Sequence, residues 1–350
     1  MKKSTITNYA TYGGVIIAFV VLYILNNFGM LGPVLSGQLV PICAYVVMAL
    51  SLNLTVGVLG ELSLGHAGFM SVGAFAGATA NIALAASIPN TGVRLAVVLV
   101  IATICAAIAG VLIGIPVLRL RGDYLAIVTL AFGEIIKSII NNLYIGMDAK
   151  GLHFAFLNAE NLKMDGGKMI LKGSQGITIM PTSTFVAGFV LVMITLVIIF
   201  NLVGSRSGRA IMALRDNRIA AESVGINVTK YKMMAFVTSA ALAGAAGALY
   251  AQGMFVLDPK KFNYDTSILI LVFVVLGGLG RMWGSIIAAA ALTVLPELLR
   301  EVRDYRMLAY AIVLILVMLV TNNPTIKNFV QAIAEKFKGK KVETKGAGQQ

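Results

Sequence analysis

Long, uninterrupted apolar stretches constrain this chain more than any other feature. Residues 184–203, for example, read TFVAGFVLVMITLVIIFNLV, without one charged side chain. A helix of about 20 apolar residues crosses the roughly 30 Å hydrocarbon core of a bilayer. A membrane β-barrel would instead alternate apolar and polar residues in strands of about ten. Because the apolar stretches here are continuous, the sequence predicts an all-α, polytopic integral membrane protein.

The apolar stretches predict about ten membrane-spanning helices. Only 12% of the residues are charged, against about 25% in soluble domains. The third span is rich in glycine and alanine, which suits either close helix packing or a re-entrant segment. The expected order is a cytoplasmic N-terminus (1–11), a transmembrane region (12–322) and a basic cytoplasmic tail (323–350). The spans are residues 12–27, 38–58, 64–86, 93–118, 124–143, 184–203, 233–251, 266–276, 285–299 and 305–321.

The basic residues predict the orientation. The net charge is +13, with many Lys and Arg residues in the segment 204–232 and in the tail. Cytoplasmic loops of membrane proteins carry such an excess, so both termini and that segment are expected in the cytoplasm of a bacterium, with the spans in its inner membrane. Nucleic-acid binding is not expected, because the charges lie in short loops and a tail. The loop 144–183 falls outside, either as a cap over the outer mouth or as a tolerated insertion with a short hairpin.

One polar stretch interrupts the apolar pattern between two expected spans. It reads IMALRDNRIAAESVGINVTKYK and covers residues 211–232. Its apolar positions recur at helical spacing, and a glycine follows where a helix would end in a left-handed cap. We therefore expect one short amphipathic helix over 209–225. An interfacial helix resting on lipid is the simpler interpretation. Mixed charges and small side chains favour docking into a cleft on another protein. The apolar positions are Ile211, Leu214, Ile219 and Val224.

Several long stretches resemble the permease subunits of ABC importers, in particular the M-type subunit of the branched-chain amino acid (Liv-type) permeases. They are ALRDNRIAAESVGINVTKYK, MALSLNLTVGVLGELSLGHAGFMSVGAFAGA, LRGDYLAIVTLAFGEII and LVFVVLGGLGRMWGSIIAAAALTVLPELL, and they span most of residues 40–320. One departure is LKGSQGI at 171–177, where Lys172 replaces the first glycine of the family's outer-loop pattern TGGSxGI. That replacement leaves the role of the loop open.

The resemblance implies an ABC-importer permease fold and a division of labour among subunits. The chain itself would be no enzyme and would need no cofactor. Two cytoplasmic ABC ATPase subunits would drive transport, an external solute-binding protein would deliver Leu, Ile or Val, and a second permease subunit, identical or related, would complete the path. The residues expected to couple to the ATPase are Arg215, Asp216, Asn217, Ala220, Ala221, Glu222 and Gly225.

Polar residues inside the expected spans are candidates for the translocation path. Charges in a bilayer are costly and mark pathways or structural locks. Glu134 and Lys137, three residues apart on one helix face, form either a structural ion pair or a path group and its neighbour. Glu61 is expected as a gate or elbow contact, and His66 more as a packing residue than as a ligand. The candidates are Asn53, Glu61, Ser63, His66, Ser71, Thr129 and Glu134.

Two further patterns bear on function. Nothing in the chain matches the phosphate-binding pattern GxxxxGK[ST], and there are only two histidines, so neither a nucleotide site nor a metal site is expected. A weak internal similarity links residues 56–68 with 274–286, as in the repeats of many transporters. A permease for urea, amides or sugars and a stand-alone ion-coupled transporter remain as alternatives. Co-purification with ATPase subunits would distinguish an ABC importer from the stand-alone transporter.

Overall fold

The computed structural model describes residues 2–120, 122–148, 151–158, 162, 167–298, 311, 312 and 315. The chain divides into two compact units, Met1–Val294 and Leu295–Gln350. The expected tail (323–350) and nearly all of the expected tenth span lie outside the described residues. The first unit is mostly helical and carries every candidate site residue, so the description that follows concerns that unit.

Nine of the ten expected spans coincide with helices. Within the described residues, five helical segments are long and apolar enough to cross a membrane, namely Asn8–Asn27, Pro33–Leu59, Thr91–Val117, Phe185–Gly204 and Val228–Ala251. The predicted count of about ten crossings therefore stays a prediction. The helices are α1 (Lys2–Asn27), α2 (Pro33–Asn53), α3 (His66–Ala83), α4 (Thr91–Val117), α5 (Asp123–Asn141), α6 (Phe185–Gly204), α9 (Val228–Ala251), α10 (Tyr264–Gly277) and α11 (Met282–Leu298). Because α1 begins at Lys2, no structural boundary separates residues 2–11 from the first span.

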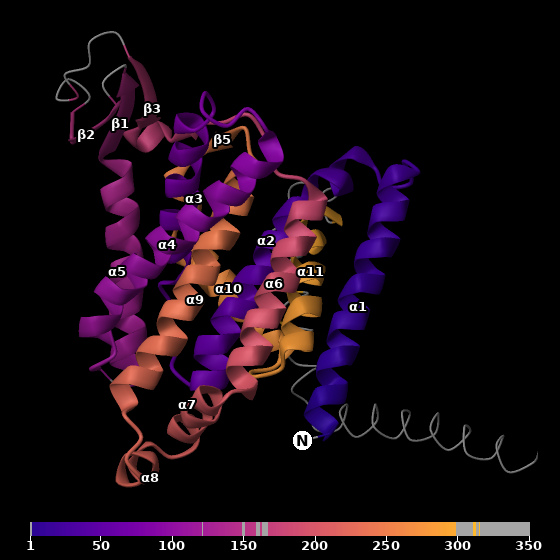
Figure 1. The fold of residues 1–350 in the computed structure, drawn as a ribbon, viewed down its shortest axis with the longest axis vertical. Helices are drawn as coiled ribbons and strands as arrows, with labels where there is room; N and C mark the ends of the chain where they lie inside the picture. Colours follow the sequence, from indigo (N-terminus) through magenta and orange to yellow (C-terminus); the bar gives the residue numbers. More distant parts are fainter. Residues whose placement is uncertain are drawn as a thin grey trace, which may run out of the picture. The chain divides into compact units, whose positions relative to one another are not determined.

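Helix α9 is the centre of the packing and runs between α3, α4 and α2 (Figure 1). Small residues make these close crossings possible. A Cβ added to Gly73 of α3 would collide with the backbone of Gly244 on α9, and one added to Gly247 would meet the carbonyl of Met70. A Cβ on Gly244 would in turn meet the Cβ of Ala106 on α4. The glycine-rich third span is therefore explained by helix contact.

The second expected span is not one regular helix. Helix α2 ends at Asn53 and continues as a π-helical turn, η1 (Leu54–Leu59). Gly60 ends that turn with a left-handed φ of 82°, which glycine adopts without strain. Residues 61–65 are not helical, and α3 begins only at His66. The predicted boundary between the second and third spans, residues 58 and 64, therefore agrees with Leu59 and His66 to within two residues, but the sequence did not predict the π-helical turn.

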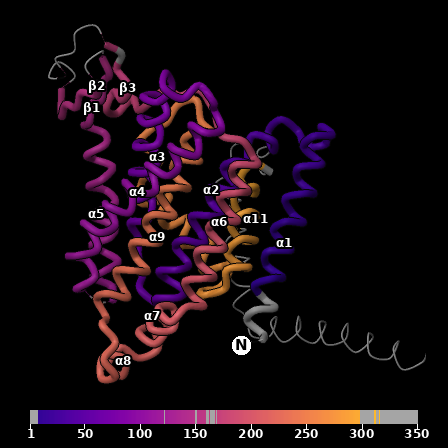
Figure 2. The backbone as a smooth tube through the Cα atoms, viewed as in Figure 1, coloured from indigo at the N-terminus to yellow at the C-terminus, as the bar shows by residue number. Residues whose placement is uncertain are grey.

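Two small sheets correct the all-α expectation. β1 (Leu143–Asp148) pairs antiparallel with β2 (Gly151–Phe156) and with β3 (Lys168–Lys172), giving the order β2-β1-β3. β4 (Ile177–Thr178) pairs antiparallel with β5 (Val256–Leu257). In Figures 1 and 2 the larger sheet lies at one end of the helices, and the polar segment after α6 lies at the other. The loop 144–183 thus has a sheet and the 3-10 turn η3 (Gly173–Gln175).

Candidate functional site

The polar segment after α6 forms two short helices rather than the single one expected. α7 (Arg206–Asp216) and α8 (Arg218–Ser223) meet at Asn217. Asn217 has extended dihedrals (φ −155°, ψ 104°), and its side-chain oxygen accepts a hydrogen bond from the backbone N–H of Ala220 at 3.1 Å. An Asn that satisfies the first N–H groups of a helix is a strong N-cap. Asn217 therefore ends one helix and starts the next, which turns the chain.

The expected left-handed cap at Gly225 is present. Gly225 has φ +83°, its N–H donates to the carbonyl of Glu222 at 3.0 Å, and the N–H of Ile226 donates to the carbonyl of Ala221 at 3.1 Å. These two bonds form a Schellman motif, in which glycine is the favoured residue. The end of α8 is therefore fixed by local hydrogen bonds.

The break at Asn217 divides the predicted apolar face. Leu214 is buried in a small cluster with Ala221 and Val228, but Ile219 is 80% exposed and Val224 is 76% exposed. Ala221 is only 4% exposed, so its placement on the docking surface was wrong, and a bulky residue there would disrupt the segment itself. Ala220 and Glu222 are exposed. The surface of α8 and of the residue that follows it thus carries two exposed apolar side chains among polar ones.

The charged residues of the segment bond mainly to one another. Arg218 Nε donates to Glu222 Oε1 at 3.0 Å, one helical turn away. Arg215 donates from Nε and Nη2 to Asp216 Oδ1 at 3.1 and 3.0 Å. Its remaining group, Nη1, donates to the backbone carbonyl of Gly57 at 3.0 Å. Arg215 therefore reaches the base of α2.

Asn53 and Glu61 flank that base and make specific contacts. Asn53 is fully buried; its Oδ1 accepts from the N–H of Gly280 at 2.8 Å and its Nδ2 donates to Ser285 Oγ at 2.9 Å. Glu61 forms an ion pair with Lys232 at the start of α9. Lys232 is buried, and the sequence analysis missed it because it stands at the edge of the polar stretch, far from Glu61 in the chain. Glu61 is thus paired, as an elbow contact would be.

Four smaller candidates lie along residues 63–71 and the helix that covers them. Ser51 Oγ and His66 Nε2 are 2.8 Å apart, and both residues are buried. Thr129 Oγ1 on α5 accepts from the N–H of Leu64 at 3.0 Å. The hydroxyl of Ser71 donates to its own helix, at the carbonyl of Gly68. The Ser63 hydroxyl is buried and has no hydrogen-bond partner among the described residues.

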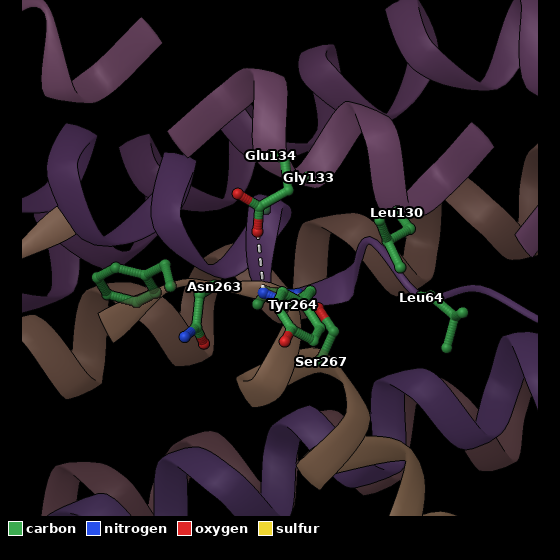
Figure 3. Close-up of a pocket in the computed structure, with 10 residues that line it drawn as sticks. Leu64, Leu130, Gly133, Glu134, Asn263, Tyr264 and Ser267 are labelled. Atoms are coloured by element: carbon green, nitrogen blue, oxygen red, sulfur yellow. Dashed lines mark hydrogen bonds between the residues drawn. The ribbon is translucent and has the colours of Figure 1, made fainter. Parts of the chain in front are cut away.

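Each of the two carboxylate oxygens of Glu134 makes one contact. Oε2 lies 2.6 Å from Lys137 Nζ, and Oε1 accepts from the backbone N–H of Tyr264, the first residue of α10, at 3.0 Å (Figure 3). A carboxylate at a helix N-terminus is electrostatically favourable. The small pocket beside it, shared with Leu64, Gly133 and Ser267, has no space for a water molecule. The predicted ion pair is present, and Glu134 also joins α5 to α10.

Polar residues at the other end of the helices were missed by the sequence analysis. Gln252, just past α9, is completely buried. Its Oε1 accepts from Asn81 Nδ2 at 2.8 Å and from Thr182 Oγ1 at 2.9 Å, and its Nε2 donates to the carbonyl of Gly77 at 3.3 Å. Its main-chain carbonyl accepts from the N–H of Thr182 and of Ser183. No motif marks a lone glutamine, so only the structure reveals this hub.

A large apolar groove lies on another face of α5. Its volume is about 550 Å³, and it is lined by α3, α4, α5 and the strands β1, β2 and β3. Phe75, Cys105, Ile140 and Leu152 are among its residues. Thr79 lines it too, and its hydroxyl has no hydrogen-bond partner within the described part of the chain. The groove has no charged group that would orient an amino acid.

The comparisons with known proteins agree with the helical architecture. The chain is 36% identical over 286 residues to the high-affinity branched-chain amino acid transport system permease proteins LivM of Salmonella typhimurium and Escherichia coli, covering 79% of this chain and 66% of each relative. It thus spans slightly less than two thirds of those relatives. It is 31% identical over 123 residues to the ribose import permease protein RbsC of Haemophilus influenzae, covering 33% of this chain and 38% of that protein.

No solved structure matches the chain significantly. Residues 34–321, which run from α2 to beyond α11, match one family along their whole extent. The chain belongs to the family of branched-chain amino acid transport system permease components.

Proposed function

We propose that this chain is a permease subunit of an ATP-driven importer of the branched-chain amino acids leucine, isoleucine and valine. The observation that carries the proposal is the exposed apolar pair Ile219 and Val224 at the tip of a polar segment, in a chain of a transport permease family. Water-exposed apolar groups rimmed by polar residues are typical of protein contact sites. Two cytoplasmic ATPase subunits are the proposed partners there.

The other parts of the assembly follow from the same proposal. A binding protein outside the cell delivers the amino acid, and a second permease subunit, identical or related, completes the path across a bacterial inner membrane. Both termini and the segment 204–232 lie in the cytoplasm, as the excess of basic residues favours. The substrate class is supported by the names of the relatives of Salmonella typhimurium and Escherichia coli.

The proposed path runs past the non-helical residues 61–65 and along α5. Ser63 supports this course, because its buried hydroxyl lacks a hydrogen-bond partner among the described residues and a substrate group or water would satisfy it. Glu134, whose side chain is 36% exposed, presents its carboxylate on α5. Thr129 on the same helix is buried and bonds to Leu64 and Ala126, so we place it behind the path. Asn53, His66 and Ser71 instead bond within the protein, so we assign them to packing around the path.

The docking surface is tested by adding charge to it. Burying an isoleucine side chain at an interface contributes about 1.5–3 kcal/mol, so Ile219→Asp should weaken ATPase binding by about tenfold or more. The chain is purified in mild detergent from cells that co-express the candidate ATPase, and the bound ATPase is quantified. Thr229→Asp is the matched control, because Thr229 is exposed in the first turn of α9 and gains the same charge. Unchanged binding by Ile219→Asp would argue against docking at α8.

The substrate class needs a separate measurement. Uptake of radiolabelled leucine into vesicles that hold the complete assembly should be reduced by isoleucine and valine. Ribose serves as the control competitor, because one shorter match is to a ribose permease. Transport of ribose without transport of leucine would contradict the proposed substrate.

A further inference from the structure

The side chain of Arg215 is engaged with its own chain, although it lies in the segment proposed to dock the ATPase. Its Nη1 donates to the carbonyl of Gly57 in η1 at 3.0 Å, while its other two donors hold Asp216. The guanidinium holds its five N–H donors in a rigid planar fork, whereas the ammonium of a lysine is a compact charge on a flexible stem. Arg215 therefore links α7 directly to the base of α2.

The turn that receives this bond is unusual in its geometry and tightly packed. η1 is a π-helix, a rare conformation that is frequent at functional sites. A Cβ on Gly57 would collide with Asn53 Oδ1 and with the N–H of Gly280. A Cβ on Gly60 would come within 2.6 Å of Arg215 Cγ. Gly60 thus leaves room for the stem of Arg215, and Gly57 allows the close approach of Gly280.

Contacts lead from η1 to two other parts of the unit. Asn53, immediately before η1, accepts from the N–H of Gly280 and donates to Ser285, which joins it to the turn between α10 and α11. Glu61, immediately after Gly60, pairs with Lys232 of α9. Asn53 and Lys232 are both buried, so losing either contact leaves a buried polar group without its partner, which is costly. A shift of η1 therefore acts on α9 and on the α10–α11 turn together.

We propose that Arg215 is a positioning residue that transmits movement of the segment α7–α8 to η1, and through η1 to α9 and the α10–α11 turn. This inference rests on the proposed function, because it presupposes that an ATPase moves α8. Arg215 contributes to coupling and not to ATPase affinity, which Ile219 and Val224 supply. The difference between coupling and affinity can be tested, because an arginine in a docking segment would ordinarily be expected to contact the partner.

The test measures coupling separately from binding. The complete assembly, with ATPase and binding protein, is reconstituted with wild-type, Arg215→Ala or Arg215→Lys permease. Amino acid uptake and ATP hydrolysis are measured on the same vesicles, with bound ATPase and the melting temperature as further readouts. Arg206→Ala is the matched control, because Arg206 is an exposed arginine at the start of the same helix.

The expected result is specific to transmission. Arg215→Ala should keep the ATPase bound and hydrolysing, while amino acid moved per ATP falls by about tenfold, the factor for losing one hydrogen bond from a charged donor. Arg215→Lys should recover part of this ratio, and Arg206→Ala should match the wild type. An unchanged ratio in Arg215→Ala overturns the inference. So does release of the ATPase, because Arg215 would then be a docking contact, or failure of both Arg215 variants to assemble, because its role would then be structural.

Failure of the proposed function gives a different pattern. If wild-type permease binds no ATPase, the docking proposal fails before any variant is compared. If wild-type permease binds the ATPase and transports, but the ratio is insensitive to Arg215, only the transmission role is refuted.

Discussion

Among the residues that the structure describes, two Glu–Lys ion pairs should differ in their contributions to stability because they differ in burial. In the pair Glu61–Lys232 the side chains are 16% and 5% exposed. In the pair Glu134–Lys137 they are 36% and 23% exposed, and the two residues are neighbours on one helix. Removing one partner of a buried pair costs about 3–5 kcal/mol, since the other charge stays buried and unpaired. An exposed pair contributes about 0–1 kcal/mol.

Replacing a glutamate by glutamine removes the charge and keeps nearly the same side-chain shape. Glu61→Gln should therefore lower the free energy of unfolding by about 3 kcal/mol or more, and Glu134→Gln by about 1 kcal/mol or less. The bond from the N–H of Tyr264 to residue 134 persists in Glu134→Gln, because the amide oxygen also accepts. The double variant Glu61→Gln/Lys232→Met should regain much of the loss, since it removes the unpaired buried charge.

Thermal unfolding of each variant is measured in one detergent. The readout is the fraction of the protein that remains monodisperse after heating. The melting temperature should be highest for the wild type, slightly lower for Glu134→Gln, lower again for the double variant and lowest for Glu61→Gln. Equal melting temperatures for Glu61→Gln and Glu134→Gln would refute the argument from burial. A double variant less stable than Glu61→Gln would refute the pairing with Lys232.

The remaining predictions concern helix packing and orientation. Gly73→Ala should strongly lower the yield of folded protein, because the added Cβ meets the backbone of Gly244. The control Gly37→Ala should express normally, because its Cβ meets nothing within 4 Å. Equal yields of the two variants would contradict the close crossing of α3 and α9. Single cysteines at the exposed positions Ser223 and Ser174, in a background without Cys43 and Cys105, should respectively resist and react with an impermeant thiol reagent on intact cells. The opposite labelling would invert the proposed topology.

Apolar periodicity was sufficient to locate helices but not to describe how they begin and end. Residues 184–203 and helix α6 agree to within one residue at each end, because a continuous apolar run has no alternative to a helix in lipid. The stretch from Leu54 to Leu64 is also mostly apolar, yet it contains a π-helical turn, a left-handed glycine and non-helical residues. Hydrophobicity cannot distinguish these conformations, since they depend on contacts with α5, α9 and the α10–α11 turn.

The candidate site shows the same limit. The helix-ending role of Gly225 was predicted correctly, because a Schellman motif is local. Ile219 was placed on one apolar face with Leu214 but is exposed, because the helical period was counted through Asn217, where the helix breaks. The partner of Glu61 was missed because Lys232 is 171 residues away in the chain. For Glu134, the sequence suggested only Lys137 as a partner. Its second partner, Tyr264, could not be predicted because it belongs to α10, which is distant in the sequence.

The buried Gln252 determines which parts of its end of the helices can separate. Its side chain and carbonyl hold Asn81, Gly77, Thr182 and Ser183, so α9, α3 and the irregular segment leading to α6 share five hydrogen bonds through one residue. Each bond contributes about 1 kcal/mol, and breaking them together would cost more than a typical conformational step between populated states. These three elements therefore travel as one rigid block during any transport cycle, and spectroscopic labels placed on them would report no change in distance while labels across the block's edge would.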